Sequence, residues 1–198
     1  LLEYGVYSYV SDNTLNDFDR GIGIYEGAGV FGTPVCCPVQ NNIISNHFNP
    51  ASSYATMRRY GRIAIEISNR FSNHTNATIS SNDILNSTIG IHALNSVLIK
   101  IINQNTYETQ IPEANLTFLH YGIWVQNCYA AQIIDNNVTN GIKWSGGTIT
   151  TANGSSLRDL IKGITIANSS KCLLKQNIIF NMGAGIDVFD NCTNSNLF

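Results

Sequence analysis

Residues that could contact a ligand recur at one place in a repeated motif, Gly-Ile-x followed by Ile, Val or, once, Ala. His92 follows Gly90-Ile91, Trp124 follows Gly122-Ile123, and Asp187 follows Gly185-Ile186. Side chains of a β-strand alternate between two faces, so the apolar positions of this motif point into a core and the x positions point outward. Imidazole, indole and carboxylate groups at successive outward positions would suit a sugar polymer, because aromatic faces stack on sugar rings and polar groups bind hydroxyls.

The alternation predicts two outward rows. The first row reads Gly23, Ala64, His92, Trp124, Thr165 and Asp187, and the second reads Tyr25, Glu66, Leu94, Gln126, Ala167 and Phe189. From these rows and one neighbouring loop we predict an exposed carbohydrate-contacting strip of Tyr25, Glu66, His92, Tyr121, Trp124, Gln126 and Asp187. In the alternative interpretation, the neighbouring loops cover His92 and Trp124, and both residues are structural.

Catalytic motifs are weak in this sequence, and we assign no catalytic residue. A glycosidase needs two carboxylates at a set separation. Glu66 and Asp187 are four coils apart, roughly 19 Å at the spacing of stacked strands, which is too far. A lyase-type site around Arg62, His92, His120 and Tyr121 is a further hypothesis. The basic cluster Arg58, Arg59 and Arg62 indicates either contact with an acidic sugar or a solvated loop.

Two interleaved patterns show which elements must position these residues. The Gly motif occurs at residues 21–24, 90–93, 122–125, 163–166 and 185–188, and Arg62–Ile65 is interpreted as the same element without its glycine. Between these segments, an Asn followed two residues later by an apolar residue recurs at Asn13, Asn42, Asn82, Asn105, Asn136 and Asn177. A period of about 20 residues with short alternating strands is typical of a solenoid.

A third marker lies five or six residues after most of the motif glycines, at Asn95, Asn127, Asn168 and Asn191. Stacked coils would place these side chains above one another. We therefore predict a buried ladder in which each amide bonds to the next coil.

The Gly-Ile-x-Ile and Asn-x-Ile repeats resemble those of the right-handed parallel β-helix, the pectin-lyase-like superfamily, over about Gly5 to Phe198. The resemblance implies an all-β, single-stranded parallel β-helix of about seven coils with loop insertions, in one domain, residues 1–198. The expected core residues are Ile22, Ile24, Ile63, Ile65, Ile91, Ile123, Val125, Ile164, Ile166, Ile186 and Val188. The superfamily includes lyases, hydrolases, adhesins and inert stalks, so its fold does not fix an activity.

Loop insertions are predicted at residues 46–60, 109–121 and 140–162, before the Gly strand, and at 26–39 and 68–77, after it. Insertions on one side of a solenoid often build its binding face. They are equally compatible with neutral surface decoration.

Composition excludes several classes of partner. The chain has 11 basic and 13 acidic residues, with no basic face for nucleic acid. It has no apolar run long enough to span a membrane. The five cysteines, Cys36, Cys37, Cys128, Cys172 and Cys192, form no zinc-type pair. Cys128 and Cys192 should not bond each other, because two coil rises, about 9.6 Å, exceed a disulfide's reach.

Three functional hypotheses remain open. The first is an extracellular or cell-surface module of a larger protein, structural or adhesive, whose partners are a glycan and other parts of its own chain. The second is a polysaccharide lyase or glycoside hydrolase with its remaining active-site coils outside this stretch. The third is a spacer. No cofactor is expected, although the resemblance implies calcium if the protein is a lyase.

Overall fold

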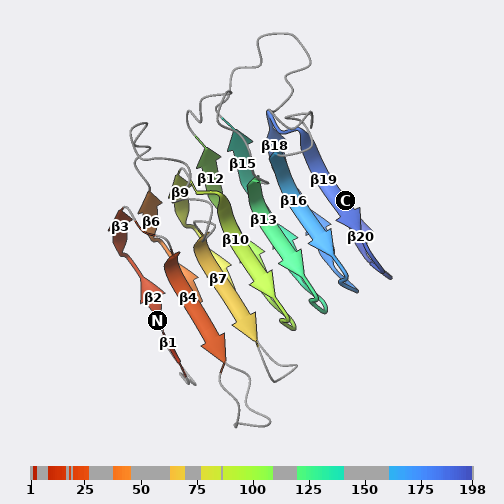
Figure 1. Cartoon of the computed structure of the whole chain (residues 1–198), viewed down its shortest axis with the longest axis horizontal. Coiled ribbons are helices and arrows are strands. Elements are labelled where there is room, and N and C mark those ends of the chain that lie inside the picture. The colour runs from red at the N-terminus through yellow and green to blue at the C-terminus, as the bar shows by residue number, and fades with distance from the viewer. Residues whose placement is uncertain are drawn as a thin grey trace, which may run out of the picture.

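The computed structural model describes residues 2–3, 9–16, 18, 20–26, 38–45, 63–69, 77–85, 87–108, 120–140 and 161–197. In this part of the chain every paired strand is parallel to its neighbours, and no helix occurs. Successive strands along the sequence enter the first, second and third sheet in turn, so that each coil stacks on the one before it (Figure 1). The predicted parallel β-helix solenoid is confirmed.

The first sheet has seven strands. They are β1 (Leu2–Glu3), β4 (Arg20–Glu26), β7 (Ile63–Asn69), β10 (Ile89–Leu94), β13 (His120–Gln126), β16 (Ile161–Ala167) and β19 (Ala184–Phe189). Apart from the two-residue β1, its strands have six or seven residues and are the longest of the fold. They include the Gly-Ile-x-Ile motifs, so this sheet presents the predicted site.

The other two sheets are built from shorter strands. The second contains β2 (Val10–Ser11), β5 (Pro38–Gln40), β8 (Thr78–Ser80), β11 (Lys100–Ile102), β14 (Gln132–Ile134), β17 (Leu173–Lys175) and β20 (Asn196–Leu197). The third contains β3 (Thr14–Asn16), β6 (Ile43–Ser45), β9 (Asp83–Leu85), β12 (Asn105–Glu108), β15 (Asn137–Asn140) and β18 (Ile178–Phe180). Both follow the Asn-containing turns of the sequence.

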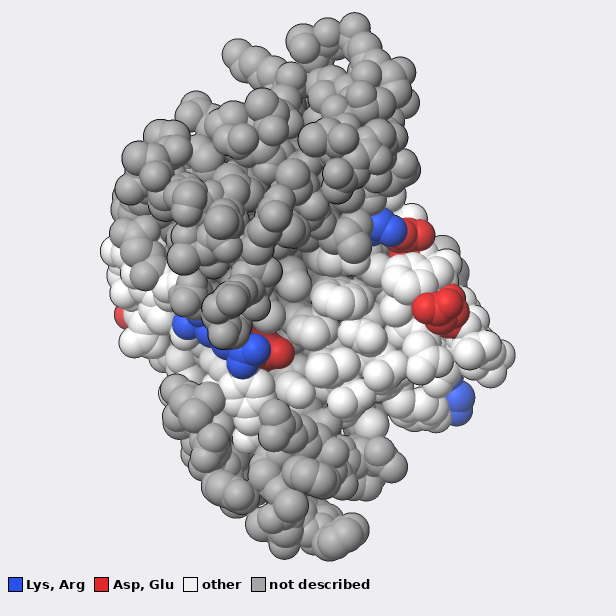
Figure 2. All heavy atoms as spheres, viewed as in Figure 1, with Lys and Arg blue, Asp and Glu red and all other residues white. Residues whose placement is uncertain are grey.

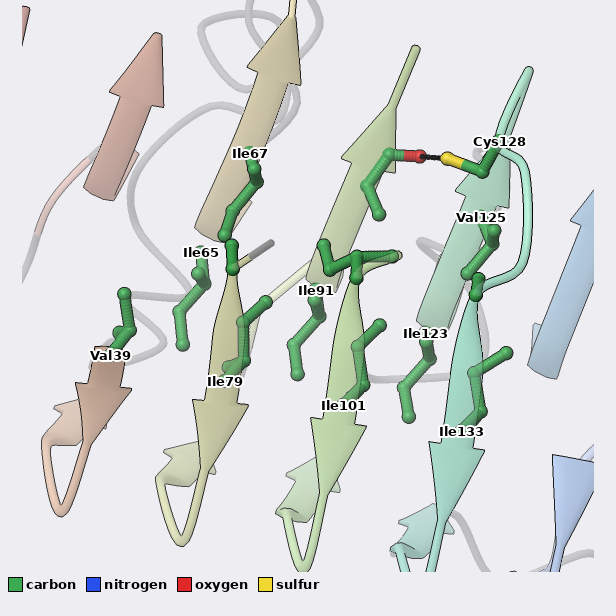
Figure 3. Close-up of a cluster of buried hydrophobic side chains, with 14 of the residues drawn as sticks. Val39, Ile65, Ile67, Ile79, Ile91, Ile101, Ile123, Val125, Cys128 and Ile133 are labelled. Atoms are coloured by element: carbon green, nitrogen blue, oxygen red, sulfur yellow. Dashed lines mark hydrogen bonds between the residues drawn. The ribbon is translucent and has the colours of Figure 1, made fainter. Parts of the chain in front are cut away.

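The core is formed by β-branched side chains that repeat at the same place in successive coils. Ile65, Ile91 and Ile123 are adjacent on neighbouring strands and completely buried. The second sheet adds a facing row that includes Ile79, Ile101 and Ile133 (Figure 3). Each buried isoleucine contributes about 1.5–3 kcal/mol of transfer free energy, so the stacked rows hold the three sheets together.

Two of the expected core residues are not buried. Ile186 is 46% exposed and Val188 is 39% exposed. They align with the buried Ile164 and Ile166, but they lie on β19, the edge strand of the first sheet. Since no described strand pairs beyond β19, these two side chains lack the covering coil that buries their counterparts.

The register of β7 differs from the prediction by two residues. Ile65 pairs with Ile22 and Ile91, and Glu66 pairs with Gly23 and His92. Ala64 therefore takes the place of the motif glycine, and Glu66 joins the first outward row. The run from Ile63 to Ile67 has an isoleucine at every second position, so alternation alone leaves its register ambiguous.

The predicted ladder of Asn95, Asn127, Asn168 and Asn191 is only half right. Asn127 Nδ2 donates to Asn95 Oδ1 at 3.1 Å, and Asn168 Nδ2 donates to Asn127 Oδ1 at 2.7 Å. All four side chains, however, are exposed. Their φ angles are positive, and asparagine tolerates this left-handed turn conformation. The residues that point inward here are the next ones along the chain, Ser96, Cys128, Ser169 and, in part, Cys192.

The buried amide ladder lies between the second and third sheets. Asn42 Nδ2 donates to Asn82 Oδ1 at 2.9 Å, and Asn82 Nδ2 donates to Gln104 Oε1 at 2.9 Å. Asn136 continues the row and donates to Asn177 Oδ1 at 2.8 Å. The same amides also bind main-chain carbonyls, so the network satisfies polar groups inside the solenoid.

One rung of this ladder corrects the predicted alignment. The repeat was aligned on Asn105, but Gln104 is the buried residue that occupies the row, and Asn105 is exposed. Thr106 then pairs with Ile84 and Val138 in the third sheet. The strands on either side keep one register, so the repeat does not shift; only the predicted alignment is off by one residue, because the ladder position holds glutamine instead of asparagine.

The cysteines agree with the prediction as far as they are described. Cys128, Cys172 and Cys192 are free thiols. The isolated bridges Tyr129↔Ser170 and Ser170↔Thr193 place Cys128 and Cys192 in one row, with Ser169 between them. Cys36 and Cys37, the arginines 58, 59 and 62, and most of the predicted loop insertions lie outside the described residues.

Candidate functional site

The candidate site is a row of side chains that crosses the outer face of the first sheet. Backbone pairing aligns Gly23, Glu66, His92, Trp124, Thr165 and Asp187 on β4, β7, β10, β13, β16 and β19. We call these six residues the outer row. The predicted neighbour relationship of His92 and Trp124 is confirmed, and the corrected register adds Glu66 directly beside His92.

At one end of the outer row, Glu66 binds three partners. The hydroxyl of Tyr25 donates to Glu66 Oε2, and Arg20 Nη1 lies 3.3 Å from the same oxygen. Arg20 also donates to the Tyr25 hydroxyl at 2.8 Å. His92 Nδ1 lies 3.7 Å from Glu66 Oε1, which is an ion-pair distance rather than a hydrogen-bond distance.

These contacts shift two acid–base equilibria. The nearby imidazole of His92, followed by the Tyr25 hydroxyl and the Arg20 guanidinium, lowers the pKa of Glu66 against the opposing effect of burial. Burial, reinforced by the Glu66 carboxylate, raises the pKa of Tyr25 to about 12. Near neutral pH the pair is therefore an ionised Glu66 and a protonated Tyr25, which is the state that the hydrogen bond requires.

The centre of the outer row is an aromatic stack. The rings of His92 and Trp124 are 4.5 Å apart and inclined by 19°, and the rings of Tyr121 and Trp124 are 4.6 Å apart and inclined by 15°. Tyr121 also packs with Ile63 and Ile89, which form an apolar cluster separate from the main core. The stacked rings of His92 and Tyr121 hold the Trp124 indole in place. A ligand could contact the part of the indole that neither ring covers.

Polar atoms in the same row have no hydrogen-bond partner among the described residues. They are the His92 Nδ1 and Nε2 atoms, Trp124 Nε1 and Thr165 Oγ1, on three successive strands. All are buried atoms, and burying a donor or acceptor without a partner costs about 1–3 kcal/mol. Such groups often mark a place where a ligand or water completes the bonding.

At the other end of the outer row, Asp187 forms an ion pair with Lys162. Lys162 Nζ also lies 5.6 Å from the centre of the Phe189 ring. Burial raises the pKa of Tyr121, which pairs with Lys162 across β13 and β16. The row thus has an aromatic centre and an acid–base ion pair at each end. Among the described residues in Figure 2, charged side chains are scattered, in places adjacent, and the rest of the described surface is uncharged.

The structure brings most of the predicted site residues together but does not expose them all. Glu66, His92 and Tyr121 are buried, contrary to the expected exposed strip, whereas Tyr25, Trp124, Gln126 and Asp187 are half-buried. Tyr121 belongs to β13, although the sequence placed it at the end of a loop. Gln126 lies in the second outward row, in register with Leu94 and Ala167.

Sequence reasoning missed Arg20 and Lys162 as members of the site. Both immediately precede a motif glycine, as Tyr121 does, and backbone pairing aligns Tyr121 with Lys162. The residue before each motif glycine therefore forms a further row beside the outer row. That signal was present in the sequence, because these positions hold Arg20, Ile89, Tyr121, Lys162 and Ala184, with Ile63 before Ala64, rather than turn residues.

Within the described residues, no group of three or more His, Cys, Asp or Glu side chains is arranged to hold a metal ion. No described helix has the length and apolar character to cross a membrane. The fold and the outer row define a parallel β-helix with a polar–aromatic face. In comparisons with protein-family models, curated proteins and solved structures, the chain matched none of them.

Proposed function

We propose that this chain is a pectin-lyase-like β-helix module of a larger extracellular or cell-surface protein, and that its first sheet contacts carbohydrate. One observation supports this most directly. Successive strands of the outer row present a stacked indole and imidazole with unpartnered polar atoms, between two ion pairs. An extended glycan lying along the solenoid axis could contact the face on successive coils, since coils repeat every 4.8 Å or so.

The burial and contacts of the site residues suggest two roles, contact with the glycan and positioning of the contacting residues. The half-buried Tyr25, Trp124, Gln126 and Asp187 would touch the glycan. The buried Glu66, His92 and Tyr121 would hold Tyr25 and Trp124 in position, through the hydrogen bond and the stacked rings described above. This arrangement needs no catalytic group and suits an adhesive or structural module.

The test is titration calorimetry of the folded chain with panels of oligosaccharides. Trp124→Ala should weaken binding about tenfold or more, because stacking contacts of this kind contribute about 1.5 kcal/mol. Tyr129→Ala is the matched control: Tyr129 is an exposed aromatic residue outside the outer row. Equal binding by wild type and Trp124→Ala would reject the proposal that the outer face of the first sheet binds carbohydrate. Location is tested separately, by labelling the full-length protein on intact cells.

A second candidate function is a polysaccharide lyase or glycoside hydrolase. The observation that favours it is the Glu66–His92 pair, two titratable groups 3.7 Å apart beside an aromatic platform. An enzyme of this kind would generate new chain ends from a polysaccharide, and Glu66→Gln would abolish that activity. If the folded wild type binds a polysaccharide but generates no new chain ends, the enzyme hypothesis is rejected and the adhesive module remains.

A further inference from the structure

A small pocket lies where the third sheet turns into the first, next to the outer row. Its apolar wall is formed by Ile84, Ile161 and Met182, and Tyr121 contributes a side. Tyr121 is the same ring that stacks on Trp124, so the pocket and the aromatic centre of the site share a wall. The pocket is small, with about 20 Å³ that the centre of a water molecule can occupy, and it is open to solvent on one side.

Two hydroxyl groups in this pocket have no hydrogen-bond partner in the part of the chain that the structure describes. Ser87 and Thr106 line it and are 8% and 6% exposed, and neither Ser87 Oγ nor Thr106 Oγ1 bonds to any described group. Thr106 occupies a row whose neighbours are Ile84 and Val138, where a valine would fit without a buried polar atom. A hydroxyl can both donate and accept a hydrogen bond. The two hydroxyls together can therefore bind a ligand group that has one donor and one acceptor.

The charges around the pocket favour a neutral occupant. No carboxylate is among the described residues that line it. Lys162 lies at the pocket but is already paired with Asp187. His120, another residue that lines the pocket, already has an interaction partner. An anion would therefore lose its hydration without gaining an unpaired fixed cation, which is unfavourable.

We propose that this pocket binds the acetamido group of an N-acetylated amino sugar, whose ring lies against the adjoining aromatic face. The acetamido carbonyl accepts a hydrogen bond from one hydroxyl, and its N–H donates to the other. Its methyl group packs against Ile84, Ile161 and Met182. This inference rests on the proposed glycan-binding function and names the substrate class of the same face.

The experiment compares two oligosaccharides that differ in the acetamido group alone. Calorimetry measures the affinity of the folded chain for the tetramer of β-1,4-linked N-acetylglucosamine and for that of β-1,4-linked glucose. The galactose and N-acetylgalactosamine monosaccharides are tested in the same way. At least one N-acetylated sugar should bind about tenfold or more tightly than its partner, because two hydrogen bonds and a buried methyl group are gained.

Thr106→Val should remove most of this preference and leave the affinity for the unacetylated sugar unchanged. Ser87→Ala is the second variant, in case Thr106→Val does not fold. Ser96→Ala is the matched control, because Ser96 is also a buried serine but lies outside both the pocket and the outer row.

Two results would overturn the inference. Equal affinity for acetylated and unacetylated partners, or a preference that survives both pocket variants, would remove the acetamido assignment and leave the glycan face intact. If none of the sugars in this or the wider panel binds, both the assignment and the proposed function fail.

Discussion

The hydroxyl of Tyr25 donates a hydrogen bond to Oε2 of Glu66 on the adjacent strand, and the Tyr25 ring lies over Gly23 to reach it. A Cβ atom at Gly23 would be 2.6 Å from Tyr25 Cε2, closer than such atoms approach. The absence of a side chain at position 23 therefore lets a residue of the second outward row complete the outer row.

Gly23→Ala should displace the Tyr25 ring and break its bond to Glu66. We expect the Tyr25 pKa to fall from about 12 toward its ordinary value near 10, since burial and the Glu66 carboxylate both raise it and a displaced ring loses both. Ultraviolet titration of wild type, Gly23→Ala and Tyr25→Phe measures this. Gly185→Ala is the control, because the nearest atom to a Cβ there is 3.9 Å away. An unchanged Tyr25 titration in Gly23→Ala would contradict the geometry.

Glu66 should make stability depend on acidity. Its folded-state pKa is lowered, so its stabilising contribution is present above the unfolded-state pKa, about 4.3, and is lost as the pH falls through the folded-state value. Urea unfolding from pH 7 downward should therefore show a falling free energy of unfolding below about pH 5. Glu66→Gln should flatten this slope; an identical slope in the variant would show that Glu66 makes no such contribution.

The two amide rows should differ in their effect on stability. Asn82→Ala removes a buried amide that bonds Asn42, Gln104 and the Val39 carbonyl, and should cost on the order of 3 kcal/mol of unfolding free energy. Asn127→Gly removes an exposed amide while keeping the positive φ, and should cost less than about 1 kcal/mol. Urea unfolding measures both, and equal costs would mean that burial does not separate the rows.

The thiols should differ in reactivity. Burial raises the pKa of Cys128 to about 12 and also raises the pKa of Cys172. The thiolate is the reactive form, so both should resist alkylation at pH 8 until the chain unfolds, whereas the half-buried Cys192 should react before these two. Mass mapping after timed alkylation measures the order. Rapid labelling of Cys128 in the folded chain, or a Cys128–Cys192 crosslink, would contradict the row assignment.

The sequence was sufficient to predict the coils. Alternation of apolar residues marks each strand, and the recurrence of the Gly-Ile-x-Ile motif marks where each new coil begins. The sequence did not settle the register of β7, where isoleucines at 63, 65 and 67 satisfy more than one alignment. It also assigned the buried ladder to the wrong turn. Asn95 and Ser96 are both polar, and backbone conformation decides which one faces inward, whereas the buried amides lie in the turn that contains Asn82.

The site was predicted as a set of neighbours but not as a geometry. Strand alternation is enough to place His92 beside Trp124. Their burial is not a property of the strand, because it depends on what packs over the outer row. The roles of Arg20 and Lys162 likewise depend on contacts across strands, with Glu66 and Asp187, which follow from the register.

The central claim, that the outer row contacts a glycan, is tested most directly at the Trp124 indole. Its Nε1–H is buried and has no described partner, so a bound hydroxyl or a rearranged stack should shift its proton and nitrogen resonances. Two-dimensional NMR of the folded chain, with Trp144→Phe to assign the two indole signals, follows this atom during titration with the oligosaccharide panel. We predict a saturable shift of the Trp124 signal with at least one glycan. A Trp124 signal unmoved by every glycan, or binding that shifts other residues alone, would contradict the account.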